Sequence, residues 1–149
     1  MKNPKVSIDI SVVIPTYKRI EGLENCLKSL FVQDYPKERY EVIVVDDGND
    51  EAVKIMLDQL QEKHLNLRYL AQDHKGPAVA RNRGAQASLG QIIAFIDDDC
   101  RVCDGWLKAM AFSHRKNPEI VAIGGLTLTS PQKSPVLVSQ VLSNCSIET

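Results

Sequence analysis

The chain has 149 residues, which is about the size of one domain. Apolar residues make up 44% of it and charged residues 25%, and this ordinary globular composition excludes a disordered segment, a collagen-like repeat and a disulfide-rich miniprotein. The 18 basic and 19 acidic residues nearly cancel, so the overall charge gives no indication of a nucleic-acid partner.

The first half of the chain alternates between strand-like and helix-like patterns. Every second residue from Val6 to Ile14 is apolar, which is the period of a β-strand. Apolar residues then recur every three or four positions between Leu23 and Phe31, as on one face of a helix. The next predicted elements are a strand buried on both faces at 42–45, a helix at 53–60 and a strand at 67–71.

The second half continues the alternation. Pro77 suits the first position of a helix, which is predicted to run through residues 78–89 and to end at Gly90. Residues 92–96 have the apolar composition of a second buried strand. The remaining predicted elements are a helix capped by Asp104, a fifth strand at 120–123 and a short helix at 136–142.

This alternation predicts an α/β fold, with a Rossmann-like, mostly parallel sheet and helices on both of its faces. Ligands of such sheets bind beyond the carboxyl ends of the strands, where the strand order reverses. Residues 1–126 are expected to form the α/β unit, and residues 127–149 a C-terminal loop and short helix. No apolar run approaches the length of a membrane-spanning helix, and the N-terminus lacks the apolar stretch of a signal peptide.

Two acidic clusters follow predicted strands, Asp46-Asp47-Gly48 and Asp97-Asp98-Asp99. They would flank the reversal point if the first strand lies between the second and the fourth. Three adjacent carboxylates repel one another, and a bound divalent cation, Mg²⁺ or Mn²⁺, removes that repulsion. Turn formation and helix capping remain an alternative, above all for the first cluster.

Two other features have competing interpretations. Cys100 and Cys103 have the spacing of a zinc or redox pair, but the sequence has no second ligand pair, which favours ordinary reduced thiols. Arg81 and Arg83 fit either a solvated helix face or a contact to a diphosphate or an aspartate.

Four short segments, in order along the chain, resemble a known family. They are Ser11-Val-Val-Ile-Pro-Thr-Tyr-Lys-Arg19, Val44-Val-Asp-Asp-Gly48, Gly76-Pro-Ala-Val-Ala-Arg-Asn-Arg-Gly84 and Ala94-Phe-Ile-Asp-Asp-Asp99. Together they resemble family 2 glycosyltransferases of the GT-A fold, over about residues 10–125. The resemblance implies an inverting transferase that uses a nucleotide-diphosphate sugar and a divalent metal. It also implies a cytoplasmic enzyme of cell-envelope polysaccharide synthesis, whose glycan, lipid or protein acceptor could lie at the inner face of the membrane.

The resemblance also implies roles for single residues at the donor site. Pro15, Thr16 and Tyr17 would line the nucleotide site, with the Tyr17 ring against the base. Asp46 would accept a hydrogen bond from the base, and Arg81 would lie near the nucleotide or its phosphates.

Further roles concern the residues nearest the diphosphate. Asp97 and Asp99 match the family's DxD motif, with Asp99 as the direct metal ligand. Asp98 would lie close to the ribose or sugar, and Arg19 and Asp47 would complete the nucleotide site. The metal would stabilise negative charge on the departing diphosphate.

The chain departs from the family after Gly125. The family's general base is commonly the aspartate of a Glu-Asp pair, but Glu148 is the single acidic residue in this part of the sequence. The chain is therefore expected to hold the donor-binding part of a longer enzyme. A nucleotide-sugar and metal-binding fragment without transferase activity is the alternative. A phosphoryl-transfer or receiver-type protein ranks last, because the first strand ends in Pro-Thr-Tyr rather than in an acidic pair.

Overall fold

The computed structural model describes residues 7–119, 121–122 and 124–125. Residues up to Ser113 form one compact unit, which contains the sheet and its first three helices. The described residues include no helix that is both long and apolar enough to span a bilayer.

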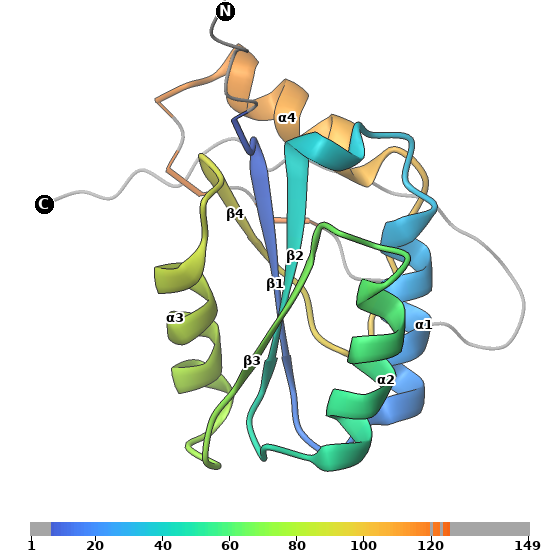
Figure 1. The fold of residues 1–149 in the computed structure, drawn as a ribbon. Helices are drawn as coiled ribbons and strands as arrows, with labels where there is room; N and C mark the ends of the chain where they lie inside the picture. The colour runs from blue at the N-terminus through green and yellow to red at the C-terminus, as the bar shows by residue number, and fades with distance from the viewer. Residues whose placement is uncertain (1–6, 120, 123, 126–149) are drawn as a thin grey trace, which may run out of the picture. The chain divides into compact units, whose positions relative to one another are not determined.

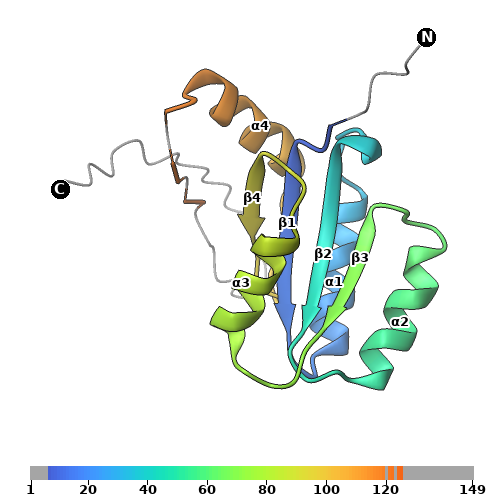
Figure 2. The same ribbon diagram turned by 60° about the vertical axis from the view of Figure 1, so that its left-hand side comes forward.

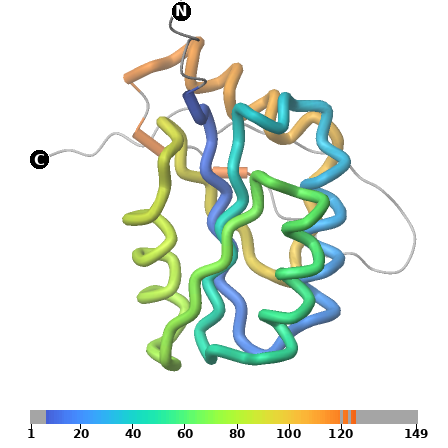
Figure 3. Tube along the Cα trace, viewed as in Figure 1, coloured from blue at the N-terminus to red at the C-terminus, as the bar shows by residue number. Residues whose placement is uncertain are grey.

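Four parallel strands form the sheet, in the order β3-β2-β1-β4. They are β1 Ile10–Thr16, β2 Tyr40–Asp46, β3 Leu67–Ala71 and β4 Ile92–Phe95 (Figure 1). The chain moves outward from β1 to β3 and then returns to the other side of β1, as the colours of Figure 3 show. The predicted α/β fold is confirmed, and β1 does lie between the two strands that precede the acidic clusters.

Helices cover both faces of this sheet, as predicted (Figures 1 and 2). They are α1 Ile20–Phe31, α2 Glu51–Gln61, α3 Pro77–Ala87 and α4 Trp106–Lys116, with a short 3₁₀ turn at Lys37–Arg39. Even-numbered residues of β1, such as Val12, join the core formed with α1, α2 and α4. Val13 points to the opposite face and packs with Ala80 of α3. This arrangement buries β1 on both faces, although the strand was predicted from its alternate apolar residues alone.

At Gly84, α3 packs closely against the sheet. A Cβ added there would lie only 2.3 Å from Cγ1 of Val13 and 3.2 Å from Cγ2 of Val45. The absence of a side chain therefore sets how close the helix can come to β1, and the same helix carries Arg81 toward the carboxyl end of the sheet.

Replacing Gly84 with alanine is expected to destabilise the fold despite the better helix propensity of alanine. The overpacked contact should lower the free energy of unfolding by about 1–3 kcal/mol, measured by urea denaturation. Asn82→Ala, at an exposed position of the same helix, should leave that energy unchanged or slightly raised. Equal stability of the Gly84→Ala variant and the parent chain would contradict the proposed tight contact.

Three sequence predictions need correction. Residues 92–96 were expected to form a buried strand, but Ile93 and Phe95 are 41% and 49% exposed, because they lie on the sheet face of Val13, where α3 packs against β1 and β2 rather than against β4. The predicted cap Asp104 does not begin α4, since Gly105, with a φ of +76°, separates it from Trp106. The helix α3 ends at Ala87, before Gly90.

The fifth predicted strand and the last helix fall largely outside the described part. Residues 120 and 123 of the predicted strand lie outside it, and Val121 and Ala122 are not in a strand. Residues 126–149, with the predicted helix at 136–142, also lie outside the described residues.

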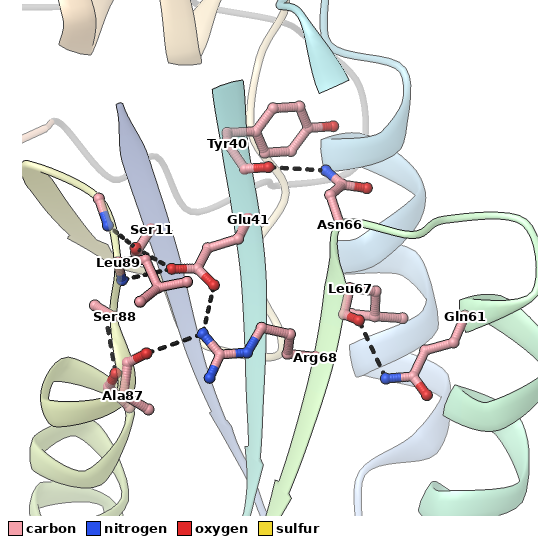
Figure 4. A network of polar contacts seen from close by, with 12 residues as sticks. Ser11, Tyr40, Glu41, Gln61, Asn66, Leu67, Arg68, Ala87, Ser88 and Leu89 are labelled. Atoms are coloured by element: carbon pink, nitrogen blue, oxygen red, sulfur yellow. Dashed lines mark hydrogen bonds and ion pairs between the residues drawn. The ribbon is translucent and has the colours of Figure 1, made fainter. Parts of the chain in front are cut away.

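A buried polar network fixes the connection between α3 and β4 near the amino ends of the strands (Figure 4). The Glu41 carboxylate accepts hydrogen bonds from Ser11 Oγ at 2.6 Å, Leu89 N at 2.7 Å and the Arg68 guanidinium at 2.6 Å. The Gly90 N–H donates to Ser11 Oγ at 2.8 Å. These donors balance a carboxylate that is only 3% exposed, so the network is a structural one at the end of the sheet opposite the acidic clusters.

Candidate functional site

The carboxyl ends of β1, β2 and β4 bring the two acidic clusters together around Thr16 and Tyr17. The backbone N–H of Asp47 donates to the carbonyl of Thr16 at 2.8 Å, and the Thr16 hydroxyl donates to Asp98 Oδ2 at 2.7 Å. Parallel strands end at one edge, so residues 82 positions apart in sequence become direct neighbours.

The three consecutive aspartates do not play equal parts. Asp98 is 5% exposed and is turned toward Thr16, whereas the side chains of Asp97 and Asp99 are 56% and 62% exposed. The helix α1 packs tightly behind them, since a Cβ on Gly22 would lie 3.1 Å from the carbonyl oxygen of Asp98. The middle carboxylate thus anchors the loop, and the outer two are presented to solvent.

Two arginines pair with these aspartates. Arg19, which directly precedes α1, lies 3.0 Å from Asp99 Oδ2 and 3.5 Å from Asp98 Oδ1. Arg81 of α3 lies 2.5 Å from Asp97 Oδ1. The sequence left open whether Arg81 lies on a solvated helix face or contacts a diphosphate or an aspartate. The structure shows the contact to an aspartate. Arg83 instead lines a shallow polar pocket, together with Asn49, Ala71, Gln72, Asp73 and Lys75.

Asp46 ends β2 and is fully buried. Its Oδ2 accepts hydrogen bonds from the backbone N–H of Asp50 at 2.7 Å and from the Tyr69 hydroxyl at 3.0 Å. Burial and the hydrogen bond to Asp46 raise the pKa of the Tyr69 phenol, which therefore keeps its proton and donates. The other oxygen, Oδ1, is buried and has no hydrogen-bond partner among the described residues. An unpaired buried carboxylate oxygen is costly, so a donor from outside the described residues would stabilise Asp46.

Asp47 is used differently, although it is adjacent in sequence. Its carboxylate accepts hydrogen bonds from the backbone N–H groups of Lys75 and Gly76 at 2.8 and 2.9 Å and from the Gln72 amide at 2.8 Å. His74 Nδ1 lies 2.9 Å from the same carboxylate. Asp47 therefore holds the loop between β3 and α3. Its predicted contact to a nucleotide stays a prediction.

The pKa of Asp47 reflects these contacts. Burial alone would raise it, but the hydrogen bonds from Lys75, Gln72 and Gly76 and the nearby His74 outweigh burial and hold the pKa below its ordinary value of 3.8. A carboxyl group whose pKa is lowered by folding stabilises the fold above its ordinary pKa, and that stabilisation is lost as the pH falls through the folded-state pKa.

Asp47→Asn is therefore expected to lower the free energy of unfolding at neutral pH, and the difference from the parent chain should shrink as the pH falls below about 4. Urea denaturation at a series of pH values measures this difference. The exposed Asp58→Asn should show no such trend. A difference between Asp47→Asn and the parent chain that stays constant down to about pH 2 would contradict the assignment.

An aromatic stack lies over the end of β1. The Tyr17 and His74 rings are stacked, with centroids 4.1 Å apart and an angle of 24° between the rings. Gly48 lies close to the same ring: a Cβ there would come within 2.9 Å of Tyr17 Cε2 and 3.7 Å of Asp46 Oδ1. Sequence reasoning did not identify His74 as a site residue, because it is an isolated histidine in a polar loop and only the fold brings it next to Tyr17.

The described residues contain no group of three or more histidine, cysteine or acidic side chains placed to hold a metal ion. The chemistry of the donor set nevertheless fits a hard cation. Asp97 and Asp99 offer exposed carboxylate oxygens, and Mg²⁺ or Mn²⁺ needs few protein ligands when it keeps waters and takes phosphate oxygens.

The cysteines near this edge have the character of ordinary thiols. Burial and the neighbouring Asp99 raise the pKa of Cys100, whose Sγ lies 3.7 Å from Asp99 Oδ1. Burial raises the pKa of Cys26 to about 12. A raised pKa lowers the thiolate fraction of a cysteine and with it the reactivity, so the environment of Cys100, one member of the Cys100–Cys103 pair, does not favour redox chemistry.

Comparison with known proteins agrees with this arrangement. The model of glycosyl transferase family 2 matches residues 11–136. Glycosyltransferase AglE of Haloferax volcanii is 40% identical over 100 residues, which make up 66% of this chain and 33% of AglE. The glucosyl-dolichyl phosphate glucuronosyltransferase of the same organism is 30% identical over 118 residues, 78% of this chain and 37% of that protein.

Solved structures give the same result for the fold. The crystal structure of S. aureus TarS 1–349 in complex with UDP-GlcNAc superposes with a TM-score of 0.67 at 30% identity, over 74% of this chain and 32% of TarS 1–349. A mannosyltransferase of Pyrobaculum calidifontis, in complex with GDP-Man and Mn²⁺, has a TM-score of 0.55 at 27% identity, over 67% of this chain and 32% of its own. The chain thus spans about a third of the length of the relatives and structures it matches. The family match over most of the sequence and the shared GT-A fold lead to one conclusion: the chain belongs to glycosyl transferase family 2.

Proposed function

We propose that residues 1–126 form the donor-binding unit of a glycosyltransferase and hold a nucleotide-diphosphate sugar at the carboxyl edge of the sheet. The observation that carries this proposal is Asp46 Oδ1, a buried carboxylate oxygen that lacks a donor within the described chain. A nucleobase that offers an N–H group beside Tyr17 would supply that donor.

The surroundings of Asp46 support a planar ligand. Gly48 leaves no side chain between Asp46 Oδ1 and the Tyr17 ring, which is 41% exposed. Aromatic rings pair by offset stacking, so the Tyr17 ring offers a face to a base once His74 moves aside. One hydrogen bond and one stacking surface would together fix the position and the plane of the base.

The diphosphate would lie toward Asp97 and Asp99. These carboxylates would hold a divalent cation, which when bound stabilises the negative charge of the leaving diphosphate. Asp98 keeps the loop in place through Thr16, and the guanidinium groups of Arg19 and Arg81, which pair with Asp99 and Asp97, would donate to phosphate oxygens.

Two solved relatives support this choice of ligand. S. aureus TarS has been crystallised with UDP and with UDP-GlcNAc, and the Pyrobaculum calidifontis enzyme with GDP-Man and Mn²⁺. For this chain we propose a nucleoside-diphosphate hexose or a related donor, with an acceptor hydroxyl in a glycan, lipid or protein. A cytoplasmic location at the membrane face remains the prediction made by the resemblance.

A second candidate is donor binding without transfer. It is favoured because the chain spans about a third of the length of the relatives it matches, and residues 126–149 contain no Glu-Asp pair. Incubation with UDP-glucose or UDP-GlcNAc separates the two functions. Release of UDP supports catalysis by this chain, whereas binding with no release supports the binding function.

The donor site itself is tested by thermal unfolding. UDP with MnCl₂ should raise the melting temperature, and EDTA should remove part of the rise, because a ligand that binds only the folded state stabilises it by about 2.7 kcal/mol at 100 times its Kd. GDP is the second nucleotide to try. Failure of UDP and GDP to change the melting temperature, with MnCl₂ and with EDTA, would contradict the proposal.

A further inference from the structure

We propose that Arg19 and Arg81 act as built-in cations of the Asp97–Asp99 loop and couple metal binding to nucleotide binding. Their guanidinium groups neutralise the aspartates before a metal binds. When metal and nucleotide bind together, the same guanidinium groups leave the aspartates and pair with the diphosphate. The inference rests on the proposed function, because it concerns how the same site would take up its two ligands.

The geometry places one arginine at each end of the acidic triplet. Arg81 comes from α3 on one face of the sheet and lies 2.5 Å from Asp97 Oδ1. Arg19 comes from the connection between β1 and α1 and lies 3.0 Å from Asp99 Oδ2. Each outer carboxylate, the pair predicted to hold the metal, is therefore already paired with a guanidinium group from a different element.

The charges explain why a metal alone would bind weakly. Three carboxylates and two guanidinium groups leave one net negative charge at the loop. A divalent cation that binds there must approach two fixed cations and compete with them for the same oxygens. Mg²⁺ and Mn²⁺ keep strong hydration shells, so this competition disfavours their binding in the absence of a further anion.

A diphosphate changes this balance. Its phosphate oxygens can accept paired hydrogen bonds from the displaced guanidinium groups. Other phosphate oxygens can serve as further ligands of the metal. The side chains of Arg19 and Arg81 are 61% and 35% exposed, so both can move to the diphosphate without a change in the core. Metal and nucleotide should therefore each raise the affinity for the other, by the same factor.

Substitution of the arginines separates this account from simple phosphate binding. Arg81→Gln and Arg19→Gln should each raise the affinity for Mn²⁺ alone, because a competing cation is removed from Asp97 or Asp99. The same variants should lower the affinity for UDP and reduce the coupling between the two ligands. A role in phosphate binding alone would lower UDP affinity without any gain in metal affinity.

The experiment measures free Mn²⁺ by electron paramagnetic resonance, with and without UDP, for the full chain and its variants. In the parent chain UDP is expected to raise Mn²⁺ affinity about fivefold or more, and in the double variant Arg19→Gln/Arg81→Gln this factor should fall toward one. Arg83→Gln is the matched control, since Arg83 lies on α3 but outside the acidic loop. It should leave the affinity for Mn²⁺ alone unchanged.

The outcomes distinguish the inference from the proposed function. Unchanged affinity for Mn²⁺ alone in both arginine variants, with UDP still bound by the parent chain, would overturn the inference and leave the donor site standing. Absence of UDP binding by the parent chain would overturn both. Circular dichroism of each variant confirms that the fold is retained, which the exposure of both arginines leads us to expect.

Discussion

Asp46→Asn is expected to remove most of the affinity of the chain for UDP. Asp46 Oδ1 is the buried oxygen without a partner among the described residues, and the amide of asparagine would place an N–H donor or a weaker acceptor there. A hydrogen bond to a charged group is worth about 1.5–3 kcal/mol, so the dissociation constant should rise roughly 10- to 100-fold. Isothermal titration calorimetry with UDP and MgCl₂ measures this change.

The control for this substitution is Asp58→Asn, which removes the same charge at an exposed position of α2. It should leave the dissociation constant unchanged. The melting temperature of Asp46→Asn shows whether the Tyr69 and Asp50 contacts to Oδ2 survive. A correctly folded Asp46→Asn chain that binds UDP as tightly as the parent would show that Oδ1 does not meet the base.

Asp99→Asn is expected to abolish the metal-dependent part of the stabilisation by UDP. The Asp99 side chain is 62% exposed, so the substitution should leave the fold intact while it removes a charged oxygen ligand. The rise in melting temperature with UDP and MnCl₂ should fall to the value seen with UDP and EDTA. Differential scanning fluorimetry under the two conditions measures both values.

Asp104→Asn is the matched control for Asp99→Asn, because Asp104 is also exposed and lies five positions further along the chain. It should keep the full metal-dependent rise. If Asp99→Asn kept that rise as well, Asp99 would not be a metal ligand, and Asp97 would become the first position to test.

The sequence was sufficient to predict the order of the strands and helices up to α4, because most of these segments have a regular apolar pattern. β1 was predicted from its alternate apolar residues and β2 from its apolar run, and both strands are buried on both faces. The stripe of α1 from Leu23 to Leu30 is likewise buried as its period requires. The exposure of β4 could not be predicted, because an apolar run does not reveal whether a helix covers the strand on each face of the sheet.

The sequence predicted that the aspartates of the site cluster at one edge of the sheet. It did not predict which of their carboxylates turn inward and which face solvent. The position of Asp46–Asp47 and Asp97–Asp99 after strands places them at one edge. Which carboxylate turns inward depends on donors from distant segments: Thr16 for Asp98, and the loop at Lys75 and Gly76 for Asp47. Residue type and spacing carry no information about such contacts.

The central claim is that the carboxyl edge of this sheet holds a nucleoside diphosphate. Titration of the isotopically labelled chain with UDP and MgCl₂, followed by two-dimensional NMR of the backbone amides, tests it most directly. We predict that shift changes concentrate at Thr16–Tyr17, Asp46–Gly48 and Asp97–Asp99, and that Ser11, Glu41 and Arg68 at the opposite end remain unchanged. Changes centred on the opposite end, or no changes at millimolar UDP, would contradict the claim.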